Sequence, residues 1–178
     1  ADTSLKRKLK FKSATISGAH LHHHNIEHLT KPGALGLNQP FDWVVLQGFS
    51  GAALSVEGRK RFQQTVEKFH KVIQKRGSRT ALYMTPAYVP PHRLVDPANT
   101  QLIRDLYVSA GDQVGATVIP VGLAFAEAYR RQPDIQLHKS FDGSHPNLLG
   151  TYLAACTVYA SLYGRSPVSN GFDVWGRV

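Results

Sequence analysis

The sequence is poor in cysteine and acidic residues, and it has no long apolar run. Cys156 is the only cysteine, so the chain cannot form an internal disulfide bond. No stretch reaches the roughly 18 consecutive apolar residues that cross a bilayer, so no transmembrane segment is expected. Only 12 acidic residues oppose 21 lysines and arginines, which gives a formal net charge of +9. This charge would suit an anionic partner. The basic residues are scattered outside the N-terminal KRKLK cluster, however, so we expect no specific nucleic-acid binding.

What the sequence does contain is an alternation of apolar strands and amphipathic helices. Its 178 residues have the size of one domain, and a hydrophobic content of 42% is sufficient for a core. The apolar run at 42–47 is typical of a central strand buried on both faces. Strands are predicted over 9–17, 42–47, 80–85 and 116–121, and helices over 58–76, 100–114, 123–131 and 146–163. This order predicts an α/β fold with a three-layer, doubly wound parallel sheet, formed by residues 1–178 as a single domain.

A short turn before the last helix carries an acid and an imidazole. Asp142 and His145 are three residues apart, and the intervening glycine and following proline favour an open turn and a helix start. Both side chains can then project to one side of the turn, with the carboxylate close enough to orient the ring. This is the Asp-His half of a nucleophilic triad, in which the imidazole takes the nucleophile's proton. The alternative is a structural one, in which Asp142 or Ser144 caps the helix.

The segment DGSHPNLLGTYLAACTVYASLYGRSP, from Asp142 to Pro167, resembles the C-terminal block of the SGNH (GDSL-like) hydrolases. The match is to a bacterial branch with a DGxHPxxxGxYLAA block and a VVLQ strand end, here Val44–Gln47. Segments 81–88 and 118–122 resemble two further strands of that branch. The resemblance implies the flavodoxin-like SGNH hydrolase fold from about Ile16 onward. The family's serine, which follows the first strand in a GDS- or GNS-type turn, has no counterpart here, so we expect an N-terminally incomplete domain that lacks its first strand.

The resemblance also implies roles for individual residues. Asp142 and His145 match the catalytic pair, and Gly18 matches the backbone donor of the oxyanion hole. Gln47 stands where most members carry an asparagine that donates its side-chain amide to the oxyanion. Ser50 follows closely in GFSGA, which is one residue short of a G-x-S-x-G elbow. We therefore expect Ser50 to contact substrate or its own loop, and not to act as the nucleophile.

A dense group of histidines raises the question of a metal site. His24 and His28 are four residues apart and would share one face of a helix, as zinc-binding pairs do. The only nearby carboxylate, Glu27, would point elsewhere on such a helix. We therefore expect neither a metal nor a cofactor. In the resembled branch a histidine recurs at the position of His24, which favours His24 as a residue that lines the site.

Together these features predict an SGNH-type serine ester hydrolase, with esterase- or deacetylase-like activity on a small-molecule or glycan ester. Its nucleophilic serine is not identifiable in the sequence. The alternative is a non-catalytic remnant of the same fold that binds a glycan or small ligand. A sheet without its first strand would have an unpaired edge, which an upstream segment or a second chain could cover. The residues themselves indicate no location; the resemblance alone favours a periplasmic or secreted protein over a cytoplasmic one.

Overall fold

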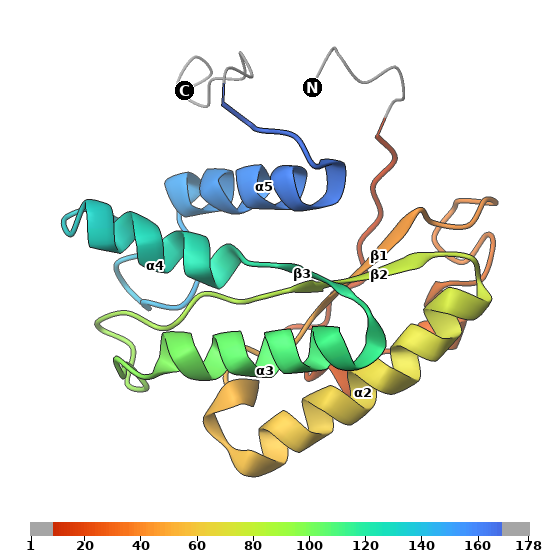
Figure 1. Ribbon diagram of the computed structural model, residues 1–178, viewed down its shortest axis with the longest axis horizontal. Coiled ribbons are helices and arrows are strands. Elements are labelled where there is room, and N and C mark those ends of the chain that lie inside the picture. The colour runs from red at the N-terminus through yellow and green to blue at the C-terminus, as the bar shows by residue number, and fades with distance from the viewer. Residues whose placement is uncertain (1–8, 169–178) are drawn as a thin grey trace.

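The computed structural model describes residues 9–168, and its centre is a three-stranded parallel sheet (Figure 1). Strands β1 (Trp43–Gln47), β2 (Arg79–Tyr83) and β3 (Thr117–Ile119) lie in that order. The pairing aligns the last residues of all three strands, so that their carboxyl ends form one edge of the sheet. That edge is where open α/β sheets place their ligands.

Helices cover both faces of the sheet. In Figure 1, α2 (Val56–Lys75) and α3 (Asn99–Val114) lie on one side, and α4 (Val121–Arg131) and α5 (Leu148–Tyr163) lie on the other. Three short helical turns complete the described elements: η1 (Leu21–His23), α1 (Ile26–Leu29) and η2 (Ala52–Leu54). The predicted α/β fold with a three-layer, doubly wound parallel sheet is therefore confirmed.

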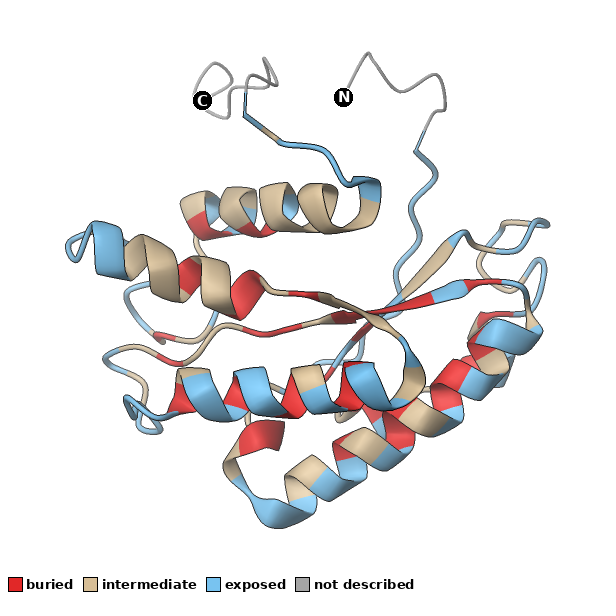
Figure 2. Ribbon diagram, in the orientation of Figure 1, coloured by how far each residue is buried: buried red, intermediate tan, exposed pale blue. Residues whose placement is uncertain are grey.

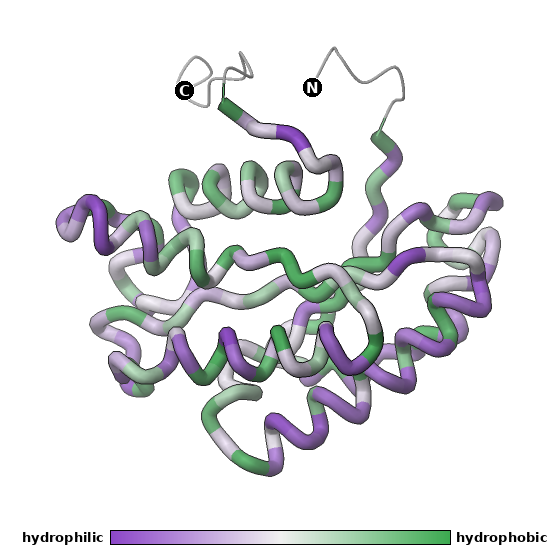
Figure 3. Tube along the Cα trace, in the orientation of Figure 1, coloured by the Kyte–Doolittle hydropathy of each residue, from purple (hydrophilic) through white to green (hydrophobic). Residues whose placement is uncertain are grey.

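The helix α2 shows how the sequence pattern produces this packing. Its apolar residues at helical spacing, among them Phe62, Val66 and Ile73, are buried against the sheet. The Ser55 hydroxyl caps the helix by accepting a hydrogen bond from the Gly58 amide at 3.0 Å. The outer face is strongly hydrophilic (Figure 3), and burial is confined to the side toward the sheet (Figure 2). The predicted amphipathic helix is thus observed, two residues longer at its start.

Strand β1 differs from the prediction of a strand buried on both faces. Leu46 is buried on the side of α2 and α3, but Val45, on the opposite face of the strand, is 43% exposed. Within residues 9–168, no strand pairs with the outer edge of β1. The prediction failed because an apolar run shows only that both faces of a strand are suited to burial. Whether a face is buried depends on another segment that packs against it.

The predicted strand over 9–17 is not formed. These residues have no regular secondary structure, and Leu9, Phe11 and Ile16 are exposed. Alternation of apolar and polar residues is a local signal, but a strand also needs a neighbour to accept and donate its backbone hydrogen bonds. No such neighbour lies beside this segment in the part of the chain that the structure describes.

Helix α5 is apolar on nearly every side (Figure 3), yet most of its surface is only partly covered. Gly150 and Ala154 are its only buried residues, Leu148 and Tyr163 are exposed, and Cys156 is half-buried. A helix that is apolar all round is normally enclosed by other elements. α5, which packs on α4 and β3, therefore presents an apolar surface that no described element encloses. None of the described helices combines the length and apolarity needed to cross a bilayer.

Candidate active site

Three loops meet at the carboxyl edge of the sheet. The loop after β1 and the loop after β2 are joined by a hydrogen bond of 2.8 Å between the hydroxyls of Ser50 and Tyr88. The second loop is joined to the turn before α5, since the Val89 amide donates to the Gly143 carbonyl at 3.0 Å. The loop after β2 is thus hydrogen-bonded both to the loop of Ser50 and to the turn of Asp142 and His145.

Within that turn the acid and the imidazole are in direct contact. His145 Nδ1 lies 2.7 Å from Asp142 Oδ2, and Asp142 Oδ1 accepts the amides of Ser144 at 2.8 Å and His145 at 3.0 Å. These two amides, with the imidazole, hold the pKa of Asp142 down at about 2. Asp142 is therefore a carboxylate at neutral pH, and it directs the ring to carry its proton on Nδ1.

The remaining ring nitrogen of His145 is free to act. The side chain is 72% exposed, and no residue in the range 9–168 bonds to Nε2. With Nδ1–H donated to Asp142, Nε2 holds its lone pair toward solvent. An imidazole with a free ring nitrogen and an ionised partner has the arrangement that a general base requires.

Helix capping is done by a residue that the sequence analysis did not single out. Asn147 Oδ1 accepts the Gly150 amide at 2.9 Å, and Asn147 Nδ2 donates to the Gln136 carbonyl at 2.8 Å. The alternative in which Asp142 or Ser144 caps the helix is therefore wrong, and α5 begins two residues after Pro146. An asparagine just before an apolar helix is a common N-cap and could have been recognised. Asp142 is left free to orient His145.

The shape of the turn depends on Gly143. Its φ of 61° is in the left-handed region, and a Cβ there would overlap the Val89 carbonyl oxygen. The turn is therefore pressed directly against the loop after β2, which no larger residue would allow. This contact fixes the position of the Asp142 and His145 side chains relative to the sheet.

Of the two residues expected in the oxyanion hole, Gln47 lies at this edge of the sheet, and within residues 9–168 no hydrogen bond joins it to Asp142 or His145. Gln47 is exposed at the end of β1, and the neighbouring Gly48 amide is occupied by a hydrogen bond of 3.1 Å to the Tyr107 hydroxyl. Burial raises the pKa of Tyr107 to about 12, so this hydroxyl remains protonated. Ser50 is bonded to Tyr88. Tyr88 in turn stacks on His92 with ring centroids 3.7 Å apart.

The N-terminal segment reaches the loop after β1 through its histidines. The rings of His20 and Phe49 lie 4.8 Å apart, while Gly18, with φ 67°, is exposed. His24 is half-buried and ends the turn η1. His24 and His28 are not on one helix, which corrects the expected shared face. Among residues 9–168, no three potential ligand side chains are arranged to hold a metal ion.

Two hollows of the surface lie away from the Asp-His pair. A hollow of about 140 Å³ lies at the opposite, amino edge of the sheet, between Trp43, His70 and Arg79. A smaller one lies between the His20 segment and α2. Neither hollow is lined by Asp142 or His145, and the His145 side chain is exposed to solvent.

A buried histidine lies beneath the turn and was missed in the sequence. His138 is 4% exposed, and its Nδ1 is 2.8 Å from the Tyr129 hydroxyl. Burial lowers the pKa of His138, and the charge of Asp142 opposes this only in part. The ring is therefore neutral at neutral pH. Its spacing in the sequence carries no signal, because its burial depends on α4 and α5.

This burial predicts an acid-sensitive stability. As the pH falls below about 6.5, the imidazole of the unfolded chain is protonated before the buried one, so the free energy of unfolding decreases. The slope reaches at most about 1.4 kcal/mol per pH unit until the folded imidazole is protonated as well. Urea unfolding at neutral and mildly acidic pH should show this decrease in the natural protein. It should be smaller in His138→Asn, and equal decreases in both would contradict the prediction.

Comparison with known proteins gives a consistent fold. No family model matches the chain, and no curated protein is similar to it in sequence. Its structure is similar to that of a DUF4886 family protein from Bacteroides uniformis, with 21% identity and a TM-score of 0.65, over 76% of this chain and 56% of that one. It is also similar to a candidate SGNH hydrolase from Slackia heliotrinireducens, with 22% identity and a TM-score of 0.63, over 81% and 79% of the two chains.

A third similar structure is LAE5, an α/β hydrolase from the metagenome of Lake Arreo. Identity is 20% and the TM-score is 0.53, over 69% of this chain and 60% of LAE5. At such identities the likeness concerns the fold alone. The described residues thus have an SGNH-like hydrolase fold, and the chain spans little more than half the length of the DUF4886 protein.

Proposed function

We propose that the chain is the part of an SGNH-type serine ester hydrolase that holds the acid and the base. The observation that carries this proposal is the contact between His145 Nδ1 and Asp142 Oδ2 at the carboxyl edge of the sheet. His145 Nε2 takes the proton of a serine hydroxyl as that oxygen attacks the ester carbonyl. The resulting imidazolium then gives the proton to the leaving alkoxide, and water releases the acyl group by the same steps. Asp142 keeps the tautomer and stabilises the imidazolium.

The oxyanion of the tetrahedral intermediate needs donors from the same edge. We assign this role to the Gly18 backbone amide and the Gln47 side-chain amide, which lie on the two segments that border the loop after β1. The free, exposed end of Gln47 supports this assignment, whereas the Gly48 amide is already bonded to Tyr107. Ser50 and the half-buried His24 are proposed to border the bound ester.

The nucleophile is proposed to follow a strand that pairs with the open edge of β1. The exposed Val45 and the uncovered apolar surface of α5 support this, because a strand and its helix would bury both. Such a unit could come from an upstream segment or from a second chain. It would also form a wall beside the exposed His145 side chain. The substrate class proposed is a small-molecule or glycan ester.

Hydrolysis of p-nitrophenyl acetate by the protein as its gene encodes it tests this function. We expect saturable hydrolysis that a chelator such as EDTA leaves unchanged, because no step uses a metal. Loss of activity in EDTA would contradict the proposal. A folded protein that binds an acetylated glycan but releases no acetate would replace it with the alternative, a non-catalytic binding domain.

A further inference from the structure

The turn that carries Asp142 and His145 is closed from below by residues 137–139. The Lys139 amide donates to the His145 carbonyl at 2.8 Å, and His138 forms an antiparallel bridge with Pro146. The Gly143 amide donates to the Lys139 carbonyl at 3.0 Å. We call residues 137–139 the base of the turn, because the turn is hydrogen-bonded to them. The position of this base determines the orientation of the Asp142 and His145 side chains.

This base is attached to α4 through one phenol. The Tyr129 hydroxyl accepts a hydrogen bond from the Leu137 backbone amide at 3.3 Å. Because that amide can only donate, the phenol proton remains for His138 Nδ1, which lies 2.8 Å away. Tyr129 thus binds two consecutive residues of the base at two atoms. The neutral His138 ring must then carry its proton on Nε2.

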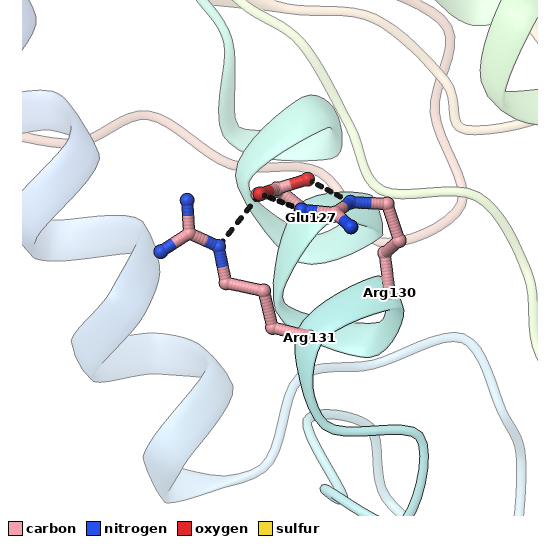
Figure 4. Close-up of polar contacts among 3 residues, drawn as sticks. All are labelled: Glu127, Arg130 and Arg131. Carbon is pink, nitrogen blue, oxygen red and sulfur yellow. Dashed lines mark hydrogen bonds and ion pairs between the residues drawn. The ribbon is translucent and has the colours of Figure 1, made fainter.

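The outer face of α4 is held separately. Figure 4 shows the Glu127 carboxylate receiving the guanidinium groups of Arg130, at 2.7 Å, and Arg131, at 2.6 Å. These cations lower the pKa of Glu127 to about 2. The three side chains are exposed, so their contribution to stability is small. The polar contacts that attach the turn to α4 are therefore those of the half-buried Tyr129.

His138 carries an energetic cost that packing alone does not explain. Its Nε2 is the one buried side-chain nitrogen or oxygen within residues 9–168 that lacks a hydrogen-bond partner. The edge of the ring packs against Phe125, with centroids 5.3 Å apart. A leucine would fill this apolar site without leaving a donor unpaired. The imidazole nevertheless provides the one acceptor that receives the Tyr129 proton and fixes the phenol.

We propose that Tyr129 and His138 are positioning residues for the Asp142–His145 pair. Through the base at 137–139, they hold the turn in the geometry that lets Asp142 accept two backbone amides and still reach the His145 ring. Neither Tyr129 nor His138 is proposed to contact the His145 ring or the substrate. The consequence for catalysis rests on the proposed function, but the consequence for the geometry of Asp142 does not.

The test is a pH titration of Asp142 in the natural protein and in Tyr129→Phe, monitored through the NMR signal of its carboxyl carbon. Loss of the hydroxyl leaves the Leu137 amide and His138 Nδ1 without this partner, so the turn loosens and its amides move away from Asp142. The pKa of Asp142 should rise from about 2 to above 3, toward the usual 3.8. Should this variant fail to fold, His138→Leu removes the acceptor instead and should give the same rise. His138→Asn keeps an acceptor oxygen and should restore the low value.

A matched control lies at the other end of the sheet. Thr80→Val also removes a hydroxyl bonded to the Nδ1 of a buried histidine, here His70 at 3.0 Å, and should leave the Asp142 titration unchanged. An unchanged titration in both Tyr129→Phe and His138→Leu would overturn the proposal. An equal rise in Thr80→Val would also overturn it, since the effect would be general.

Kinetics separate this proposal from the proposed function. In an active esterase, Tyr129→Phe should lower kcat about tenfold with KM nearly unchanged, because the His145 imidazole is misplaced while the binding surface remains. If the natural protein hydrolyses no ester but the Asp142 titration shifts as expected, the positioning role stands and the hydrolase proposal fails. If esters are hydrolysed and neither the titration nor kcat changes, the positioning role fails alone.

Discussion

Replacing His145 with alanine should lower kcat for ester hydrolysis by at least about 10³-fold, with little change in KM. Nε2 of this ring is the proposed acceptor of the serine proton, and no residue in the described chain can take its place beside Asp142. Without a base the serine remains protonated and attacks slowly. Asp142→Asn should cause a loss of about 10²–10⁴-fold, because an amide can no longer fix the Nδ1–H tautomer.

The matched control for His145→Ala is His28→Ala. His28 is also an exposed histidine but lies at the end of α1, and this variant should retain the full rate. Steady-state rates on p-nitrophenyl acetate measure all three variants under one condition. A His145→Ala protein that keeps more than a tenth of the natural kcat would show that the imidazole is not the base.

Replacing Gly150 with alanine should reduce the free energy of unfolding by about 3 kcal/mol or more. A Cβ at Gly150 would overlap the Leu137 carbonyl oxygen and approach the Phe125 ring to 3.0 Å. Both neighbours are almost fully buried, so neither can move aside without disturbing the core between α4 and α5. Because Leu137 also belongs to the base of the Asp142 turn, the site should be disturbed as well.

The control for this effect is Gly164→Ala at the end of α5. Gly164 has φ 63°, but a Cβ there would meet no atom within 4 Å. Only the backbone conformation is penalised, at a cost of about 1–2 kcal/mol. Urea unfolding of both variants should therefore separate the two costs, with Gly150→Ala the less stable. Equal stabilities would mean that α5 can shift away from Leu137 without loss.

The features that the sequence predicted are those that depend on neighbours in the chain. Helix α2 follows from the spacing of Phe62, Val66 and Ile73, and the contact of Asp142 with His145 follows from three residues of one turn. A local pattern suffices in both cases because the atoms that satisfy it are a few residues away.

The features that escaped depend on segments far apart in the chain. The bond that occupies the Gly48 amide comes from Tyr107, 59 residues away, and the burial of His138 requires Phe125 and Tyr129 of α4. The strand expected over 9–17 failed for the same reason, since its alternation could not reveal that no described strand lies beside it. In these three cases the outcome depended on which distant segments pack together, and the residue types within one segment do not reveal this.

The central claim is that His145 activates a serine in the turn after a strand beside β1. Labelling with a fluorophosphonate probe, followed by peptide mapping, tests it most directly on the protein as its gene encodes it and on its His145→Ala variant. We predict one adduct per active site, and we expect it on a serine outside residues 1–178. This adduct should be absent from the His145→Ala variant. An adduct on Ser50 would contradict the assigned nucleophile, and a folded protein that forms no adduct would contradict the hydrolase.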